Sequence, residues 1–163
     1  MACWTVPLSV LILAPLAHKK SGGQEAQALG RSRGGFSSKI HITVDGLGYP
    51  LRFRLTGGER HDMTQAEALL EGMTFEHVIA DRSYDADPLV FFILQTGASP
   101  VIPSRARRKQ PRDHDVWLYR ERHLVECLVN KLKHFRHVFS RFDKLAARFL
   151  GFLHFVGTLI WLR

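Results

Sequence analysis

Four polar residues between positions 119 and 133 have a spacing that could bring their side chains together for chemistry. They follow one another at intervals of three, four and seven residues: Tyr119, Arg122, Glu126 and Lys133. Each residue of an α-helix turns by about 100°, so these side chains fall within an arc of roughly 60°. Apolar residues occupy the nearly opposite side: Leu124, Leu128, Leu132 and Phe135. The pattern predicts a helix that holds one carboxylate beside cations, although a solvated basic face has the same spacing.

A second carboxylate follows the apolar run 77–80, which predicts a short buried strand. Asp81 stands at the carboxyl end of this strand, where open α/β sheets commonly place functional groups. Hard divalent cations prefer carboxylate oxygens, and paired metal ions can activate a hydroxyl group and stabilise a leaving oxygen. Asp81 and Glu126 are therefore two carboxylates on separate predicted elements whose type suits such chemistry, with an ordinary strand-end aspartate as the alternative for Asp81.

The spacing Tyr-x2-Arg-x3-Glu-x6-Lys resembles the signature around the catalytic glutamate of bacterial insertion-sequence transposases of the DDE class. Five further segments resemble the same family: 30–36, 39–41, 55–58, 60–62 and 79–85. The resemblance implies an α/β fold, a ribonuclease-H-like mixed sheet with flanking helices. It also implies carboxylates that bind two divalent cations, usually Mg²⁺ with Mn²⁺ as an alternative. The resemblance matches Asp81 with the second catalytic aspartate and Glu126 with the catalytic glutamate. It also implies that three signature residues support the site or contact DNA phosphate: Tyr119, Arg122 and Lys133.

The family's first catalytic aspartate has no clear counterpart in this chain. Glu25 is the sole acidic residue in the first 44 positions, and it stands in a Gly- and Gln-rich stretch. Asp45 is the nearest other carboxylate, but it begins an Asp-Gly turn, which explains it fully. Residues 1–17 do not resemble the family, so we expect the first strand to be altered or missing, through a shifted reading frame, an altered start or an internal deletion. With one carboxylate fewer to offset the charge of two cations, we expect weakened metal binding and a chain that is inactive by itself.

The remaining pattern predicts the elements that position these carboxylates. Alternating residues on both sides of 45–48 predict a β-hairpin, and Thr64 with Glu67 predicts a capped short helix. A helix over 87–95, a strand near Val101 and two long helices over 117–138 and 143–161 complete the order. We expect three regions: an atypical apolar segment (1–17), a basic flexible loop (18–36) and a truncated DDE catalytic domain (37–163). A further departure from the family is Ser83, where relatives often carry glycine, and positive φ there would strain a serine.

The composition favours a polyanionic partner and a reducing compartment. The formal net charge is +8 and the pI is about 10.0, which suits DNA. Two clusters of basic residues are candidates for contact with the phosphate backbone, with solvated loops as the alternative: Arg31, Arg33 and Lys39, then Arg105, Arg107, Arg108, Lys109 and Arg112. The chain has two cysteines and no zinc spacing, which predicts a cytoplasmic protein without disulfides. His134 and His137 have no evident third ligand, so they do not predict a metal site.

Two functions of different classes stay open at this point. The first is a truncated transposase for DNA transposition, inactive alone or dependent on a full-length transposase subunit for the missing aspartate. The second is a non-catalytic basic module that binds DNA or a full-length transposase. The apolar stretches 6–17 and 149–162 could in principle anchor both ends in a membrane, but their length and composition fit buried elements better, so no membrane is expected.

Overall fold

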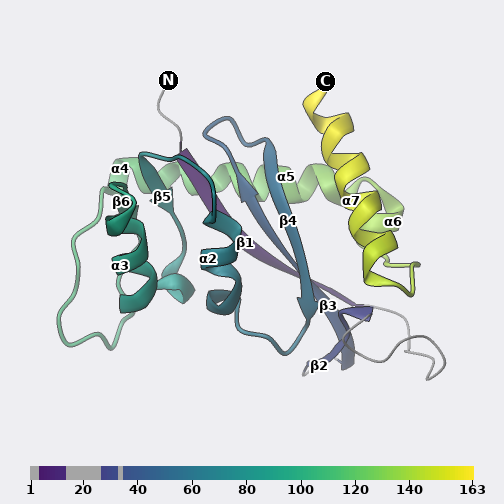
Figure 1. Ribbon diagram of the computed structural model, residues 1–163, viewed down its shortest axis with the longest axis horizontal. Coiled ribbons are helices and arrows are strands. Elements are labelled where there is room, and N and C mark those ends of the chain that lie inside the picture. Colours follow the sequence, from purple (N-terminus) through teal and green to yellow (C-terminus); the bar gives the residue numbers. More distant parts are fainter. Residues whose placement is uncertain (1–3, 14–26, 33–34) are drawn as a thin grey trace.

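A mixed β-sheet with helices on both faces forms the part of the chain that the computed structural model describes, residues 4–13, 27–32 and 35–163 (Figure 1). Six strands make up the sheet in this part: β1 (Trp4–Leu13), β2 (Gly30–Ser32), β3 (Gly35–Val44), β4 (Pro50–Gly57), β5 (His77–Ile79) and β6 (Ser99–Val101). Six α-helices are described: α2 (Ala66–Leu70), α3 (Asp87–Gln95), α4 (Val116–Tyr119), α5 (His123–Lys133), α6 (Arg136–Phe139) and α7 (Ala146–Trp161). Three short 3-10 turns accompany them: η1 (Asp62–Gln65), η2 (Arg82–Tyr84) and η3 (Arg120–Arg122).

The strand β1 lies in the middle of the sheet and gives it its mixed character. It runs antiparallel to β3 along one edge and parallel to β5 along the other, and β5 in turn pairs in parallel with β6. On its far side β3 pairs with β4 and β2, both antiparallel. The α/β class and the mixed sheet expected from the sequence are therefore present.

The apolar segment near the N-terminus forms the strand β1, so of the two expectations for the first strand, altered or missing, the second does not hold. Residues from Val6 to Leu13 pair in continuous register with Val44 to Ser37 of β3. The backbone ladder explains this placement, because main-chain hydrogen bonds do not depend on which apolar side chains a strand carries. The sheet therefore includes β1 and β2, which precede residue 37, the expected start of the catalytic domain.

The β2 strand also corrects the expectation of a flexible loop over 18–36. Gly30, Arg31 and Ser32 pair with the first residues of β3, so this part of the expected loop extends the sheet. Residues 18–26 and 33–34 of that range lie outside the described residues. The loop prediction failed here because three residues carry too little hydrophobic periodicity to predict a strand.

Two hydrophobic clusters, one on each face, hold the helices against the sheet. In β5, Val78 packs with α2 and α3, whereas the adjacent Ile79 packs with α5 and α7. This alternation follows from the two-residue period of a strand. Figure 1 shows the same layering, with α2 and α3 on the near side of the sheet and α5 crossing behind it.

Two local expectations about helices were wrong. The hydroxyl of Thr64 donates to the carbonyl of His61, and α2 begins at Ala66 without a side-chain cap. The long helix expected over 117–138 is divided, because Phe135 has extended backbone angles (φ −87°, ψ 105°) that separate α5 from α6. Periodicity could not predict this break, since apolar residues continue through it at helical spacing. Among the described residues no helix is long and apolar enough to cross a membrane.

A buried arginine fastens the C-terminal helices to the sheet. The guanidinium of Arg141 donates to the Ser38 hydroxyl and, at 2.6 Å, to the Gln27 carbonyl. It also donates to the carbonyls of Asp143 (2.9 Å) and Lys144 (3.0 Å). Arg141 is 1% exposed, so these acceptors compensate for most of the cost of removing the charge from water.

Candidate active site

Asp81 lies two residues after the end of β5 and caps the turn that comes next. Its Oδ1 accepts hydrogen bonds from the Ser83 backbone N–H (2.7 Å) and the Ser83 hydroxyl (2.5 Å). Ser83 lies in the 3-10 turn η2, and among the described non-glycine residues the positive φ angles are limited to Ala28. The condition under which serine would be strained here, a positive φ, is therefore not met, and the hydroxyl restrains the carboxylate of Asp81.

Glu126 stands on α5, on the side away from the core. Four apolar residues bury the inner side of this helix: Val125, Leu128, Val129 and Leu132. The side chain of Glu126 is 55% exposed and accepts a hydrogen bond from Arg122 Nη2 at 2.5 Å. The pair spans one helical turn, as the spacing predicts. Lys133 is exposed, and Tyr119 at the end of α4 is half-buried, with its ring edge-on to His114.

The two candidate carboxylates stand close in sequence to residues of one hydrophobic cluster. Ile79 in β5 and Val125 in α5 are both members of the core between the sheet and the helix. Asp81 lies two residues beyond Ile79, and Glu126 is the immediate neighbour of Val125. The elements that carry the two carboxylates therefore share one core, which also includes residues of β3 and α7.

Clustered metal-ligating side chains are absent from the part of the chain that the structure describes. No group of three or more His, Cys, Asp or Glu side chains with suitable proximity occurs in residues 4–13, 27–32 and 35–163. The strand β1, next to β5, reads WTVPLSVLIL and contains no acidic residue.

Asp85 is the residue near the candidate site that sequence reasoning missed. Its side chain is 1% exposed, and its Oδ1 accepts from Arg112 Nη1 (2.7 Å) and Arg108 Nη1 (2.9 Å). Its Oδ2 accepts from the Arg105 backbone N–H at 2.8 Å. Both guanidinium groups also reach the exposed Asp87. This network, which we call the Asp85 cluster, ties the basic loop 102–115 to the segment that begins with Asp81.

Several residues expected to contact DNA are engaged within the protein. Arg105 donates to the carbonyls of Arg82 (3.2 Å) and Ser83 (2.7 Å), and Arg108 and Arg112 belong to the Asp85 cluster. The hydrogen bond from Arg108 lowers the pKa of the Asp87 carboxyl below its ordinary value.

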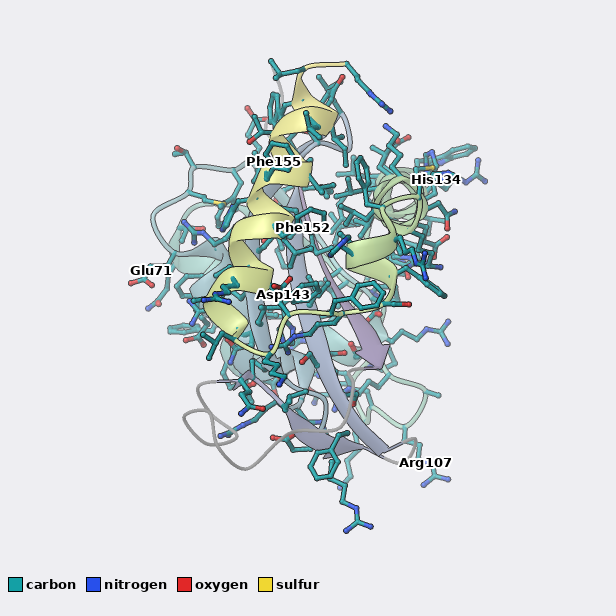
Figure 2. The ribbon with its side chains drawn as sticks, turned by 90° about the vertical axis from the view of Figure 1, so that its right-hand side faces the viewer. Glu71, Arg107, His134, Asp143, Phe152 and Phe155 are labelled. Atoms are coloured by element: carbon teal, nitrogen blue, oxygen red, sulfur yellow. The ribbon has the colours of Figure 1, made fainter. Side chains whose placement is uncertain are left out.

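The other candidates for DNA contact differ in how accessible they are. Lys39 Nζ is 2.8 Å from Asp62 Oδ1, so its charge is also paired. Arg31, Arg107 and Lys109 are exposed, and Figure 2 shows Arg107 extending away from the body of the protein. Arg33 lies outside the described residues.

Comparisons with known proteins identify the relatives of this chain. A family model described as "Transposase DDE domain" matches residues 13–155. Two curated relatives carry the description "Putative transposase for insertion sequence element", followed by IS6501 in Brucella ovis and IS402 in Burkholderia cepacia. The Brucella protein is 42% identical over 129 residues, covering 78% of this chain and 99% of the relative. The Burkholderia protein is 33% identical over 121 residues, covering 67% of this chain and 55% of the relative, so the chain spans about half of its length.

One solved structure is similar at low sequence identity. It is the cryo-EM structure of the piggyBac transposase synaptic complex with hairpin DNA, at a TM-score of 0.42 and 12% identity. The match covers 65% of this chain and 24% of that one. A likeness of this size is too weak to support an argument about function.

Proposed function

Because this chain belongs to the family of transposase DDE domains, we propose that it is a DNA-binding transposase domain that does not catalyse strand transfer by itself. The observation that carries the proposal is the distribution of acidic residues on its central elements. Asp81 follows β5 and Glu126 stands on α5, whereas β1, which lies next to β5, contributes no carboxylate. A chain with two of three required carboxylates retains the fold but lacks charge for two metal ions.

The finer fold assignment is that the mixed sheet and its helices form a ribonuclease-H-like arrangement. Support comes from the central β1, which pairs in opposite senses with its two neighbours, and from α5, which lies against β1 and carries Glu126. A domain of this kind positions its acidic residues from different elements around one part of the sheet. The truncated domain would then start at β1, with the boundaries at residues 17 and 36 falling inside it.

The metal that the family implies is a divalent cation, with Mg²⁺ as the usual ion. Asp81 and Glu126 are the described residues that would supply oxygens to it. One oxygen of Asp81 already accepts two hydrogen bonds from Ser83, and Glu126 is paired with Arg122. These two groups do not fit a complete two-metal cage, so binding should be weak and no catalytic step is assigned to the isolated chain.

The interaction with DNA would depend mainly on charge. The net charge of +8 and the exposed Arg31, Arg107, Lys109 and Lys133 favour contacts with phosphate. Side chains in the Asp85 cluster contribute less, because carboxylates already neutralise them. Tyr119 and Arg122 would act by holding α5 and the Glu126 carboxylate in position.

A nicking assay tests the catalytic part of the proposal. Supercoiled plasmid is incubated with the purified chain and Mg²⁺ or Mn²⁺, and the wild type is compared with Glu126→Gln and with the matched control Glu121→Gln. We expect all three to bind the plasmid and none to nick it. Nicking by the wild type and by Glu121→Gln, but not by Glu126→Gln, would show that the chain is catalytic.

The alternative function is a non-catalytic module that binds a full-length transposase and supplies or blocks a subunit. The Burkholderia relative, of which this chain spans about half, is the partner to test because it includes sequence beyond the part that this chain matches. Mixing the two proteins and measuring mass by light scattering distinguishes the possibilities. A mixed complex that gains nicking activity, which Glu126→Gln in this chain then removes, would favour completion of the active site by a second subunit.

A further inference from the structure

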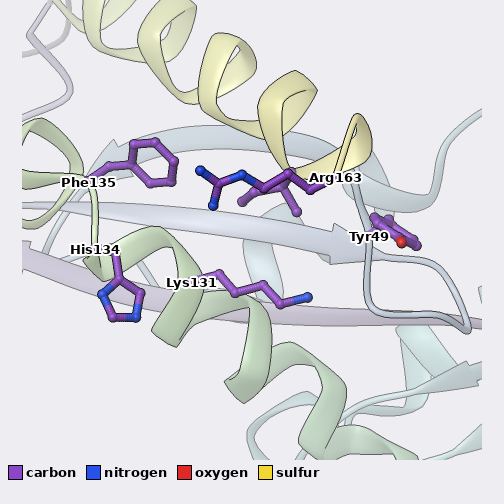
Figure 3. Close-up of a pocket in the computed structure, with 6 residues that line it drawn as sticks. Tyr49, Lys131, His134, Phe135 and Arg163 are labelled. Atoms are coloured by element: carbon purple, nitrogen blue, oxygen red, sulfur yellow. The ribbon is translucent and has the colours of Figure 1, made fainter.

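A pocket of about 540 Å³ opens between the end of α5 and the last turn of α7, away from Asp81. Six residues line it: Tyr49, Lys131, His134, Phe135, Ile160 and Arg163. Figure 3 shows Lys131 and His134 projecting from the α5 side and Arg163 reaching in from the α7 side. Its volume lies in the range of about 300–1,000 Å³ that is common for pockets that enclose small ligands.

The charge of this pocket is strongly one-sided. Lys131, His134 and Arg163 each bring nitrogen donors, and no Asp or Glu side chain is among the residues that line it. The ion pairs of the described residues include none of these three side chains. Lys131 lies over the ring of Tyr49, with its Nζ 6.0 Å from the ring centroid. Cations gathered without a counter-charge favour an anionic ligand.

The other side of the pocket is apolar, and contacts within the protein fix its position. Tyr49 stacks on Trp161 with a centroid distance of 4.7 Å, and the Trp161 indole N–H donates to the Pro50 carbonyl at 2.8 Å. Gly157 lets α7 approach β4 closely, because a Cβ there would lie 3.0 Å from the Phe53 ring. The wall opposite the cations is therefore fixed by contacts that do not involve a ligand.

We propose that this pocket binds a phosphate of the DNA backbone and places the attached deoxyribose or base against Tyr49, Phe135 and Ile160. Ammonium and guanidinium groups form strong charge-assisted hydrogen bonds with phosphate, and aromatic rings accept a sugar or base without sequence preference. Lys131 lies five residues beyond Glu126 on α5, about 7.5 Å along the helix axis. Five residues also turn by about 140° around the helix, so DNA held here would contact a side of α5 other than the one that carries Glu126. The inference rests on the proposed function, which supplies DNA as the partner.

Salt-dependent DNA binding tests the proposal on the complete chain. A short fluorescein-labelled duplex is titrated with the wild type and with Lys131→Gln/His134→Gln, and anisotropy is measured at several NaCl concentrations. Both side chains are exposed, so the double variant should fold. We expect about a tenfold loss of affinity at low salt and a log–log salt slope smaller by roughly one to two.

A matched variant distinguishes the effect of the pocket on DNA affinity from the effect of removing charge elsewhere on the protein. Lys144→Gln/His123→Gln removes the same two residue types at exposed positions outside the pocket. The proposal requires the pocket variant to lose clearly more affinity and slope than this control, and equal losses would overturn it while leaving DNA binding established. If the wild type itself does not bind the duplex, the proposed function fails, which is a different outcome.

Crosslinking supplies an independent readout of the same contact. A duplex carrying 5-iododeoxyuridine is irradiated with the wild type, and the modified peptides are identified by mass spectrometry. Adducts on Tyr49 or Phe135 are expected, and adducts confined to the basic loop 102–115 would contradict the proposal. Anionic phospholipid vesicles serve as a competing probe, and a pocket variant that loses vesicle binding but keeps DNA binding would also overturn it.

Discussion

The basic loop 102–115 and the pocket between α5 and α7 both gather cationic side chains, but they hold the charge in opposite ways. In the loop, Arg108 and Arg112 converge on the buried Asp85 and are neutralised within the protein. In the pocket, Lys131 and Arg163 meet aromatic and aliphatic groups and no Asp or Glu side chain. The longer run of basic residues in the sequence therefore has part of its charge neutralised within the protein, and Arg107 and Lys109 are the exposed cations that it leaves for a partner. Charge that stabilises a fold and charge that attracts a ligand cannot be distinguished by counting residues.

The largest expected effect comes from removing the carboxylate of Asp85 from the Asp85 cluster. Asp85→Asn leaves two partly buried guanidinium groups without their main counter-charge, and we expect a loss of about 3–5 kcal/mol in the free energy of unfolding. Urea denaturation followed by tryptophan fluorescence measures it.

Asp87→Asn is the matched control for that experiment, because Asp87 contacts the same arginines but its side chain is 75% exposed. An exposed pair should cost much less stability than a buried one. Equal destabilisation by the two variants would mean that burial of Asp85 does not set the strength of the cluster.

A buried histidine in β3, His41, makes the stability of the protein depend on pH. Burial lowers the pKa of His41 from 6.5 to about 4, with Lys39 and Arg54 acting in the same direction and Asp62 opposing them. The folded state then binds fewer protons than the unfolded state between these values, so stability is complete above pH 6.5 and is lost as the pH falls toward 4. We expect a loss of roughly 2–3 kcal/mol between pH 7.5 and pH 4.5, measured by urea denaturation.

A substitution isolates this effect from other titrating groups. His41→Gln should lower stability at pH 7.5, because the hydrogen bond between His41 Nε2 and the Thr56 hydroxyl, 2.8 Å long, is disturbed. The variant should also show a smaller loss between the two pH values than the wild type. An unchanged pH dependence would show that His41 is not responsible.

Two double variants compare the exposed cations of the loop 102–115 with those that the Asp85 cluster neutralises. Arg107→Gln/Lys109→Gln removes exposed cations, so the log–log salt slope of duplex binding should fall by about one to two. Arg108→Gln/Arg112→Gln removes as many charges from the Asp85 cluster, and we expect lower stability with a nearly unchanged slope. Anisotropy titrations at several NaCl concentrations measure both, and a larger slope change for the second pair would reverse the assignment.

The smallest expected effect concerns the exposed ion pair on α5. Arg122→Gln should cost only about 0.3–0.5 kcal/mol in unfolding free energy, because Arg122 and Glu126 form a solvent-exposed pair one turn apart. Chemical denaturation of the variant at two salt concentrations measures it. A cost above 2 kcal/mol would mean that this pair is as deeply integrated as the Asp85 cluster.

The sequence predicted those elements whose periodicity is long and regular. The hairpin of β3 and β4, the helix α3 over 87–95 and the strand β5 before Asp81 lie where the pattern places them. The family resemblance is confirmed by the match over residues 13–155. The polar spacing on α5 also predicted that Arg122 and Glu126 would face each other. These features depend on local patterns, which one sequence displays directly.

Features that depend on distant contacts could not be predicted in this way. The apolar run of β1 carries no strand alternation, and its place between β3 and β5 comes from backbone pairing across the sheet. The burial of Asp85 and its two arginine partners depends on how the loop 102–115 folds back, which spacing does not reveal. The assignment of Asp81 and Glu126 as metal ligands stays a prediction, as does contact with DNA by the eight basic candidates.

The long-range hydrogen bonds of Arg141 affect when the protein can complete its fold during synthesis on the ribosome. This side chain joins Ser38 and Gln27, which precede it by 103 and 114 residues, to the start of α7. Synthesis proceeds from the N-terminus, so the early strands must leave the exit tunnel long before this arginine arrives. Until then the apolar residues of β4 that α7 covers stay open to water, and such nascent surfaces are the ones that chaperones bind. Completion of the fold is thereby delayed until the last quarter of the chain has been translated.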